Sequence, residues 1–248
     1  MSTEKSDALV IRLADFSESS RVVTLFTREQ GKVAALAKGA KRLRGPFEAA
    51  LDLLSFCRVV FIRKSSGGLD LLTEAQLTRR FAPPGRDLNA LYGGYYVAEL
   101  LDGLTEEHDP HPDLFDAALR TLDAIASGSD PRLPILQFEL TVLKEVGRLP
   151  ELDACCACHQ PLELGAAARF WVSQGGLICP ACSRPEYQHS EIQPGTVALL
   201  RALADDDSTL AQRLSITPRQ YQELRRTLTS AISHTLERRP KMLALLKF

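Results

Sequence analysis

Two pairs of cysteines constrain this chain more than any other feature of its sequence. Cys155 and Cys158 form one C-x-x-C motif, and Cys179 and Cys182 form a second one, separated from the first by twenty residues. A tight turn in each motif directs two sulfurs to one tetrahedral edge, and apolar residues on both sides of 173–176 predict a hairpin that returns the second pair to the first. Four thiolates leave no position for a reactive water, so the Zn²⁺ that we expect here is structural.

Other uses of these cysteines are two disulfides, a redox-active dithiol or an iron–sulfur cluster, and the spacing favours zinc over them. Within the expected zinc loop, residues 155–182, Cys156 and His159 are alternative ligands. Cys156 is the weaker choice because it would form a C-x-C motif with Cys158. A further cysteine, Cys57, lies in an apolar run and is expected to be a small core residue.

Composition indicates a globular protein, since 45% of the 248 residues are hydrophobic and 25% are charged. No segment approaches eighteen consecutive apolar residues, and the first residues lack the apolar stretch of a signal peptide. The sequence therefore predicts a cytoplasmic protein without a membrane segment, in a reducing compartment that keeps thiols available for metal. The length favours two domains, which we place at residues 1–82 and 83–248.

The net charge of −1 conceals an uneven distribution of charge along the chain. Residues 1–80 contain fourteen Lys and Arg against nine Asp and Glu, whereas the remainder contains sixteen against twenty-two. A basic N-terminal part suggests that this end of the molecule meets a polyanion.

The N-terminal part has the pattern of five short strands separated by turn residues. Five strands in about eighty residues, with one long connection between the third and the fourth, favour a five-stranded barrel of the oligonucleotide-binding (OB) type. An open meander is the alternative. The expected strands are residues 8–14, 21–27, 32–40, 55–64 and 69–77.

The long connection is the densest basic segment of the chain, and its cations are Lys38, Lys41, Arg42 and Arg44. Such cations can follow a phosphate backbone and bind nucleic acid with little sequence preference. A solvated loop whose charge serves solubility is the alternative. The barrel and the positive balance of this region favour a DNA-binding segment.

After the breaker at residues 83–85 the apolar period changes to that of helices, so the fold class is α+β, with a helical domain into which the zinc loop is inserted. Gly93 and Gly94 are expected to let another helix approach closely. The basic residues 238–247 are interpreted as a solvated tail, with a phosphate contact as the alternative. The expected helices are residues 87–104, 113–127, 134–146, 195–204 and 219–238.

Several segments together resemble the RecO family of bacterial recombination mediators, and the resemblance extends over nearly the whole chain. It depends on the order of weak motifs: residues 15–27, 31–33, 37–42, 72–75, 98–101, 111–115, 138–140 and 175–182. Cys156 and His159 depart from the family pattern, in which another residue and glycine are frequent at these positions.

The resemblance implies an N-terminal OB barrel, a helical domain with a zinc-binding loop, and no enzymatic turnover. It implies binding of single- and double-stranded DNA, annealing of complementary strands, and contacts with single-strand-binding protein, RecR and the RecA-loading machinery on the nucleoid, with no small-molecule substrate. A protein-interaction adaptor without direct annealing is the alternative. A metal-dependent nuclease would need clustered carboxylates, and the acidic run at residues 205–207 is better explained as a solvated turn.

Overall fold

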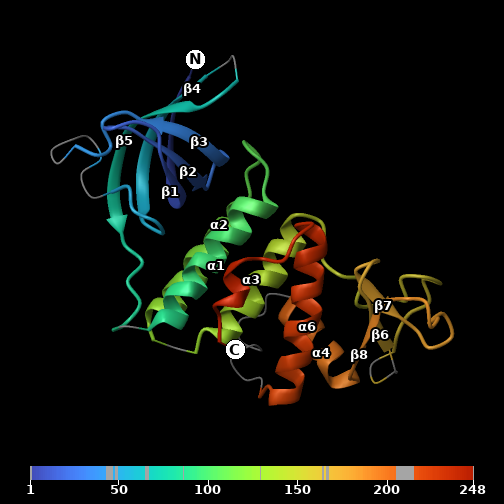
Figure 1. Ribbon diagram of the computed structural model, residues 1–248. Coiled ribbons are helices and arrows are strands. Elements are labelled where there is room, and N and C mark those ends of the chain that lie inside the picture. The colour runs from blue at the N-terminus through green and yellow to red at the C-terminus, as the bar shows by residue number, and fades with distance from the viewer. Residues whose placement is uncertain are drawn as a thin grey trace. The chain divides into compact units, whose positions relative to one another are not determined.

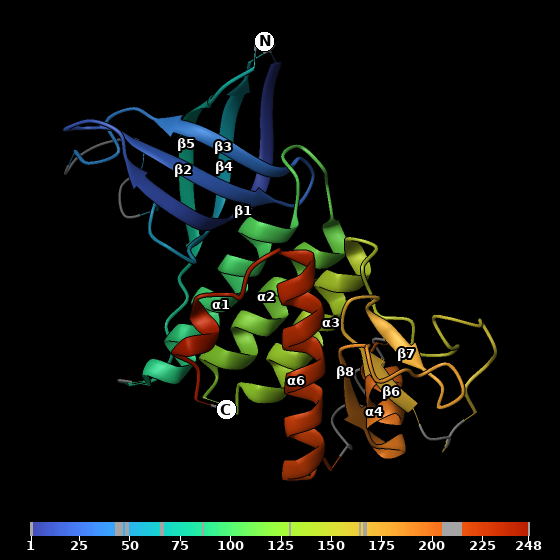
Figure 2. The same cartoon turned by 45° about the vertical axis from the view of Figure 1, so that its right-hand side comes forward.

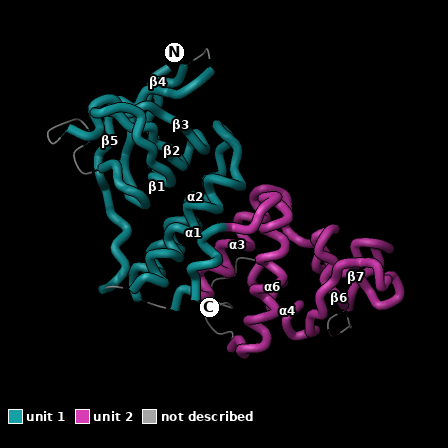
Figure 3. The backbone as a smooth tube through the Cα atoms, viewed as in Figure 1, with its two compact units in different colours: residues 1–131, 241–248 teal, residues 132–240 magenta. Residues whose placement is uncertain are grey.

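The computed structural model describes residues 2–42, 47, 50–64, 67–85, 87–128, 130–163, 165, 168–204 and 215–247. Arg44 and the acidic run at 205–207 lie outside these residues. The chain divides into two compact units, shown in Figure 3: unit 1 contains residues 1–131 and 241–248, and unit 2 contains residues 132–240. The predicted boundary at 82/83 marks the change from strands to helices, whereas the division in space groups the first two helices with the strands.

Five strands of unit 1 close into a barrel, as the sequence predicted (Figure 1). The barrel order is β1-β2-β3-β5-β4, and β1 closes the barrel by pairing with β4. Only the β3–β5 pair is parallel, which gives the crossover expected of a Greek-key OB barrel. The strands are β1 (Ser2–Asp15), β2 (Arg21–Thr27), β3 (Gly31–Ala37), β4 (Phe56–Arg63) and β5 (Asp70–Arg79).

Alternating small and branched apolar side chains build the barrel interior. In β3, every second residue from Gly31 to Ala37 is buried, because successive side chains of a strand point to opposite faces. Strand β1 begins six residues before the predicted start at residue 8. Its first residues are mostly polar, yet they pair along most of β4, from Ser2 opposite Arg63 to Asp7 opposite Arg58. Backbone pairing with a partner strand therefore extends β1 where side-chain alternation gives no signal.

Two helices complete the main body of unit 1: α1 (Leu88–Leu104) and α2 (Pro112–Ala126), which lie beside the barrel in Figures 1 and 2. Asp87 caps α1 by accepting hydrogen bonds from the backbone N–H groups of Asn89 and Ala90 at 2.9 and 3.1 Å. Arg28 of the barrel donates two hydrogen bonds to the Asp116 carboxylate of α2, at 3.1 and 2.9 Å.

For Gly94, the prediction that another helix approaches closely is wrong about the neighbour. A Cβ atom at Gly94 would lie 2.6 Å from the Phe81 ring and 2.8 Å from the Leu54 side chain. Both side chains come from segments that flank the barrel strands. The missing side chain of Gly94 thus makes room for these two residues.

The basic segment after residue 240 is not the free tail that the sequence suggested. It contains the short 3-10 helix η1 (Met242–Ala244) and belongs to unit 1. The backbone N–H groups of Lys241 and Met242 donate to the Glu99 carboxylate of α1 at 2.8 and 2.9 Å, and that of Lys247 donates to Asn89 Oδ1 at 2.9 Å.

Three helices of unit 2 pack against one another: α3 (Arg132–Glu145), α4 (Pro194–Ala204) and α6 (Pro218–Thr235). Between α3 and α6, Arg225 donates to the carboxylate of Glu139, which is fully buried. Glu223 of α6 accepts hydrogen bonds from the Thr196 hydroxyl at 2.6 Å and the Gln193 N–H at 3.0 Å, at the start of α4. Burial opposes ionisation of Glu223, but these bonds and Arg219 hold its pKa below the ordinary value.

A small antiparallel sheet completes unit 2 and contains the predicted hairpin. Its strands are β6 (Ala168–Trp171), β7 (Gly176–Ile178) and β8 (His189–Ile192), in the order β7-β6-β8. Strand β8 was not predicted, because its four residues, His-Ser-Glu-Ile, are mostly polar. Phe170, Leu177, Ile178 and Ile192 are the buried hydrophobic residues of these three strands.

Candidate metal centre and nucleic-acid interface

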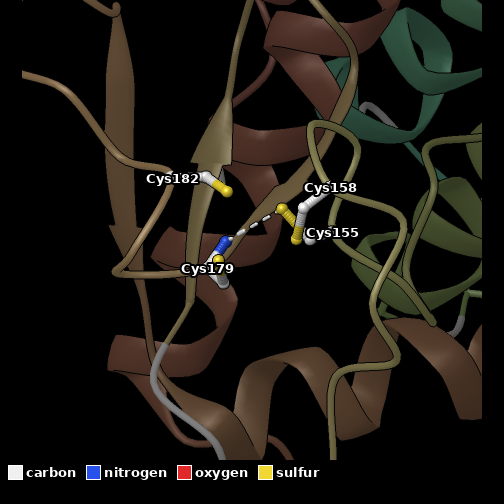
Figure 4. Close-up of side chains that lie close together, drawn as sticks. All are labelled: Cys155, Cys158, Cys179 and Cys182. Carbon is white, nitrogen blue, oxygen red and sulfur yellow. Dashed lines mark hydrogen bonds between the residues drawn. The ribbon is translucent and has the colours of Figure 1, made fainter.

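The four predicted cysteines come together at one end of β7, as Figure 4 shows. Their sulfur atoms all lie within 4.8 Å of one another. Zinc–sulfur bonds of about 2.3 Å in a tetrahedron place the sulfurs about 3.8 Å apart, so binding requires the cluster to contract by about 1 Å at most. The four cysteines are therefore positioned to bind one metal ion.

Each C-x-x-C motif forms a tight turn that is held by backbone hydrogen bonds. In the first turn, the His159 N–H donates to the Cys155 carbonyl at 2.8 Å; in the second, the Ser183 N–H donates to the Cys179 carbonyl at 3.0 Å. The two turns meet where the Cys179 N–H points to the Cys155 sulfur at 3.4 Å, the contact drawn in Figure 4. N–H groups directed at sulfur stabilise a thiolate, as a metal ligand requires.

Two of the thiols have strongly shifted acidities in opposite directions. Burial opposes ionisation of Cys155, but backbone hydrogen bonds from Cys179, Cys158 and Ala157 together with the Cys158 thiol lower its pKa to about 6. Hydrogen bonds with Cys179 and Cys158, then burial, raise the pKa of Cys182 to about 12. The protons that remain on the four thiols would be displaced when a divalent cation binds the sulfurs.

Cys156 and His159, the alternative ligands, do not belong to this group of four. Cys156 packs close to Gly176 of β7, and burial followed by the charge of Cys155 raises its pKa. His159 ends the first turn with a positive φ of 58°. Glycine adopts this conformation without steric cost, which explains why a glycine suits the position and why His159 is an unusual residue there.

Arg201 of α4 ties the expected zinc loop to the helices, a role that no sequence pattern indicated. Its guanidinium donates to the carbonyl oxygens of Leu152 and Leu162, at 3.0 and 3.1 Å, and pairs with Asp153 at 2.9 Å. One side chain thereby holds the segment before the first cysteine pair and the segment after it. The predicted insertion of the loop between helices is thus reinforced by contacts that need no metal.

The basic segment begins directly after β3 and lies against the β1–β2 connection. Lys41 bridges the two: its N–H donates to the Ser19 carbonyl at 3.0 Å and its ammonium lies 2.8 Å from the Asp15 carboxylate. The hydrogen bond from Lys41 is the main cause of the lowered pKa of Asp15, with a smaller effect of Arg21. Lys38 and Arg42 are exposed to solvent.

Among residues 2–42, 47, 50–64, 67–85, 87–128, 130–163, 165, 168–204 and 215–247, the four cysteines are the only cluster of possible metal ligands. Within the same residues, no helix combines the length and the apolar character needed to cross a bilayer.

Comparison with known proteins finds two family models that match consecutive parts of the chain. "Recombination protein O N terminal" matches residues 1–81, and "Recombination protein O C terminal" matches residues 85–244. A DNA repair protein RecO of Rhodopirellula baltica is 43% identical over 183 residues, which cover 73% of this chain and 67% of that protein. Its counterpart in Anaeromyxobacter dehalogenans strain 2CP-1 is 34% identical over 239 residues, covering 96% and 94%. That of Bacillus pumilus is 31% identical over 224 residues, covering 90% and 86%.

Proposed function

Because the chain belongs to the RecO family, we propose that it is a DNA repair and recombination mediator that binds single- and double-stranded DNA and anneals complementary strands. The observation that carries the proposal is the basic segment fixed beside an OB barrel. Lys38 and Arg42 are exposed there, and Lys41 holds the segment to the β1–β2 connection. Arg44 follows in the same segment, and residues 1–82 form the nucleic-acid-binding domain in this proposal.

The mechanism requires no covalent chemistry. Two DNA strands repel each other through their phosphates, and cations held on one protein surface neutralise both strands at once. Pairing between the bases then drives the reaction, so nucleotide hydrolysis is not needed. The sequence contains no phosphate-cradling Gly-x-x-x-x-Gly-Lys-Ser/Thr motif, which fits a reaction that is independent of ATP.

The metal in this proposal is one structural Zn²⁺ held by Cys155, Cys158, Cys179 and Cys182. Four sulfur ligands in C-x-x-C turns are the donor set that tetrahedral zinc prefers. When bound, the ion supplies a cross-link between the two turns and no open coordination position. The rest of the loop is positioned by the β6–β7 hairpin and by Arg201.

The partners in this proposal are those of the RecF pathway: single-strand-binding protein, RecR and the machinery that loads the RecA recombinase. The protein acts in the cytoplasm at the nucleoid. Membership of the RecO family is the support for these partners.

Binding of fluorescently labelled DNA at several salt concentrations tests the proposal. The variant Lys38→Ala/Arg42→Ala removes two exposed cations and leaves Lys41 in its structural contacts. We expect weaker binding to all sequences, and a log–log salt slope that is shallower by about 0.7 per lost contact for single strands and about 0.9 for duplex. Lys144→Ala, which removes an exposed cation of α3, is the matched control and should leave the slope unchanged.

Annealing is measured with complementary strands, bare or coated with single-strand-binding protein. The protein should accelerate annealing equally with and without ATP, and the double variant should lose the effect on bare strands. DNA binding and annealing that are the same for the double variant and the unaltered protein would refute the role of the basic segment. A protein that binds no DNA at low salt would instead be an interaction adaptor.

A further inference from the structure

One exposed aromatic side chain stands out in the barrel unit. Among the residues that the structure describes, the exposed large hydrophobic side chains are Phe16, Leu88 and Leu245, with exposed fractions of 61%, 59% and 44%. Phe16 is the only aromatic one, and it lies in the connection between β1 and β2. A single exposed apolar residue needs no explanation by itself, so its surroundings decide whether it has a function.

The backbone around Phe16 is held in a defined turn. The N–H groups of Phe16 and Ser17 both donate to the Ser20 carbonyl, at 3.1 and 3.2 Å, and the Ser20 N–H donates back to the Ser17 hydroxyl at 3.2 Å. Lys41 adds two contacts, from its N–H to the Ser19 carbonyl and from its ammonium to the Ser17 carbonyl at 3.1 Å. The ring is therefore presented to solvent from an ordered turn, which lowers the entropic cost of binding a ligand.

The turn that presents Phe16 belongs to the same surface as the basic segment, because Lys41 connects them. Asp15 pairs with Lys41 at 2.8 Å and with Arg21 at 3.3 Å. Asp15 is the last residue of β1, and Glu18 is the acidic residue of the connection itself. These two carboxylates are outnumbered by the four nearby cations, Arg21, Lys38, Lys41 and Arg42.

We propose that Phe16 stacks on an unpaired base of a single-stranded nucleic acid whose phosphates contact the basic segment. This inference rests on the proposed function and adds a contact that distinguishes single-stranded from double-stranded nucleic acid. OB barrels bind oligonucleotides through the face of their second and third strands and through neighbouring loops, including the first inter-strand loop. An aromatic ring accepts any base, since every base has a π-face, and phosphate contacts supply the remaining affinity.

The stacking contact favours single strands over duplex. In a duplex both faces of each base are covered by neighbouring bases, so Phe16 has no face to meet unless a base leaves the stack. A docked protein is the less favoured occupant, because Asp15, Ser17 and Glu18 around the ring are exposed and polar. No apolar patch adjoins the ring among these neighbours, whereas protein interfaces have an apolar centre.

The experiment compares three DNA probes with the full chain: an oligothymidylate of about 16 nucleotides, an abasic strand of equal length, and a duplex. We expect Phe16→Ala to weaken binding of the oligothymidylate by about five- to 150-fold, the range for loss of one stacked base. Binding of the abasic strand and of the duplex, and the salt slope, should stay unchanged. Phe16→Trp should retain or increase affinity, and Leu88→Ala, which truncates an equally exposed side chain, should have no effect.

The outcomes separate this inference from the proposed function. Equal affinity of Phe16→Ala and the unaltered protein for oligothymidylate, with salt-dependent binding intact, overturns the stacking contact and leaves the proposed function standing. An equal loss for all three probes points to damage of the turn, which overturns a base-specific contact, and thermal unfolding of the variant checks its fold. Absence of DNA binding by the unaltered protein overturns both. A loss of protein partner binding without any change in DNA binding reassigns Phe16 to a protein interface.

Discussion

Replacing Cys179 by serine is the most direct test of the metal centre. The change removes one of the four sulfurs that lie within 4.8 Å of one another, and a serine hydroxyl is not ionised at neutral pH and is a poor zinc ligand. We expect one zinc per monomer in the unaltered protein and none in Cys179→Ser. Cys156→Ser is the matched control and should keep the metal, because Cys156 lies outside the group of four.

The structural effect of metal loss should be large and local. Structural zinc contributes about 10–16 kcal/mol of apparent binding free energy in zinc-finger peptides at neutral pH, which is comparable with the whole unfolding free energy of a domain, about 5–15 kcal/mol. The sheet that depends on it has strands of only three or four residues. We therefore expect Cys179→Ser to abolish the order of β6 and β7, while the barrel of unit 1, which contributes no ligand, keeps its stability.

Elemental analysis together with amide hydrogen exchange measures both effects. In Cys179→Ser, amides of β6 and β7 should exchange much faster than in the unaltered protein, and amides of β1–β5 should exchange at unchanged rates. A chelator added to the unaltered protein should reproduce this pattern. Zinc content that survives the Cys179→Ser change, or slow exchange in β6 and β7 after complete metal removal, would show that the four cysteines do not form the proposed site.

Three further predictions concern stability and pH. Arg225→Met removes the cation paired with the buried Glu139 carboxylate and should lower the free energy of unfolding of unit 2 by about 3–5 kcal/mol in urea titrations; a loss below 1 kcal/mol would contradict the pairing. Gly94→Ala places a methyl group against Phe81 and should destabilise unit 1 by about 1–3 kcal/mol, measured as a lower Tm, whereas an unchanged Tm would mean that Phe81 moves freely. Zinc affinity should fall with falling pH, and zinc should displace protons at pH 7, because Cys182, with a pKa of about 12, is protonated there while Cys155, with a pKa of about 6, is mostly ionised. Calorimetry in buffers of different ionisation enthalpy counts these protons, and the absence of any release would contradict thiolate ligation.

The features that sequence patterns predicted well are those encoded locally. Short runs of strand-forming residues between turn residues predicted β2 and β3, and the C-x-x-C spacing predicted two turns that each place a pair of sulfurs. In all of these, the residues that determine the structure are within a few positions of one another.

The features that sequence patterns did not predict depend on residues that are distant in the sequence but adjacent in the fold. The polar start of β1 is a strand because β4 lies beside it, and β8 is a strand because β6 offers a free edge. The neighbours of Gly94 and the carbonyl groups bound by Arg201 become visible only when separate segments meet. The exposure of Phe16 was also not predictable from the local sequence, because a phenylalanine in a strand-rich region is expected to be buried.

The return of the chain to α1 after residue 240 has a consequence for the order of synthesis. Glu99 accepts its two hydrogen bonds from Lys241 and Met242, which a ribosome adds only after the whole of unit 2. The barrel and its two helices therefore emerge first but remain incomplete until unit 2 has been made. Once both ends of unit 2 are held, its chain is a closed loop, and a closed loop gains less conformational entropy on unfolding than a chain with one free end.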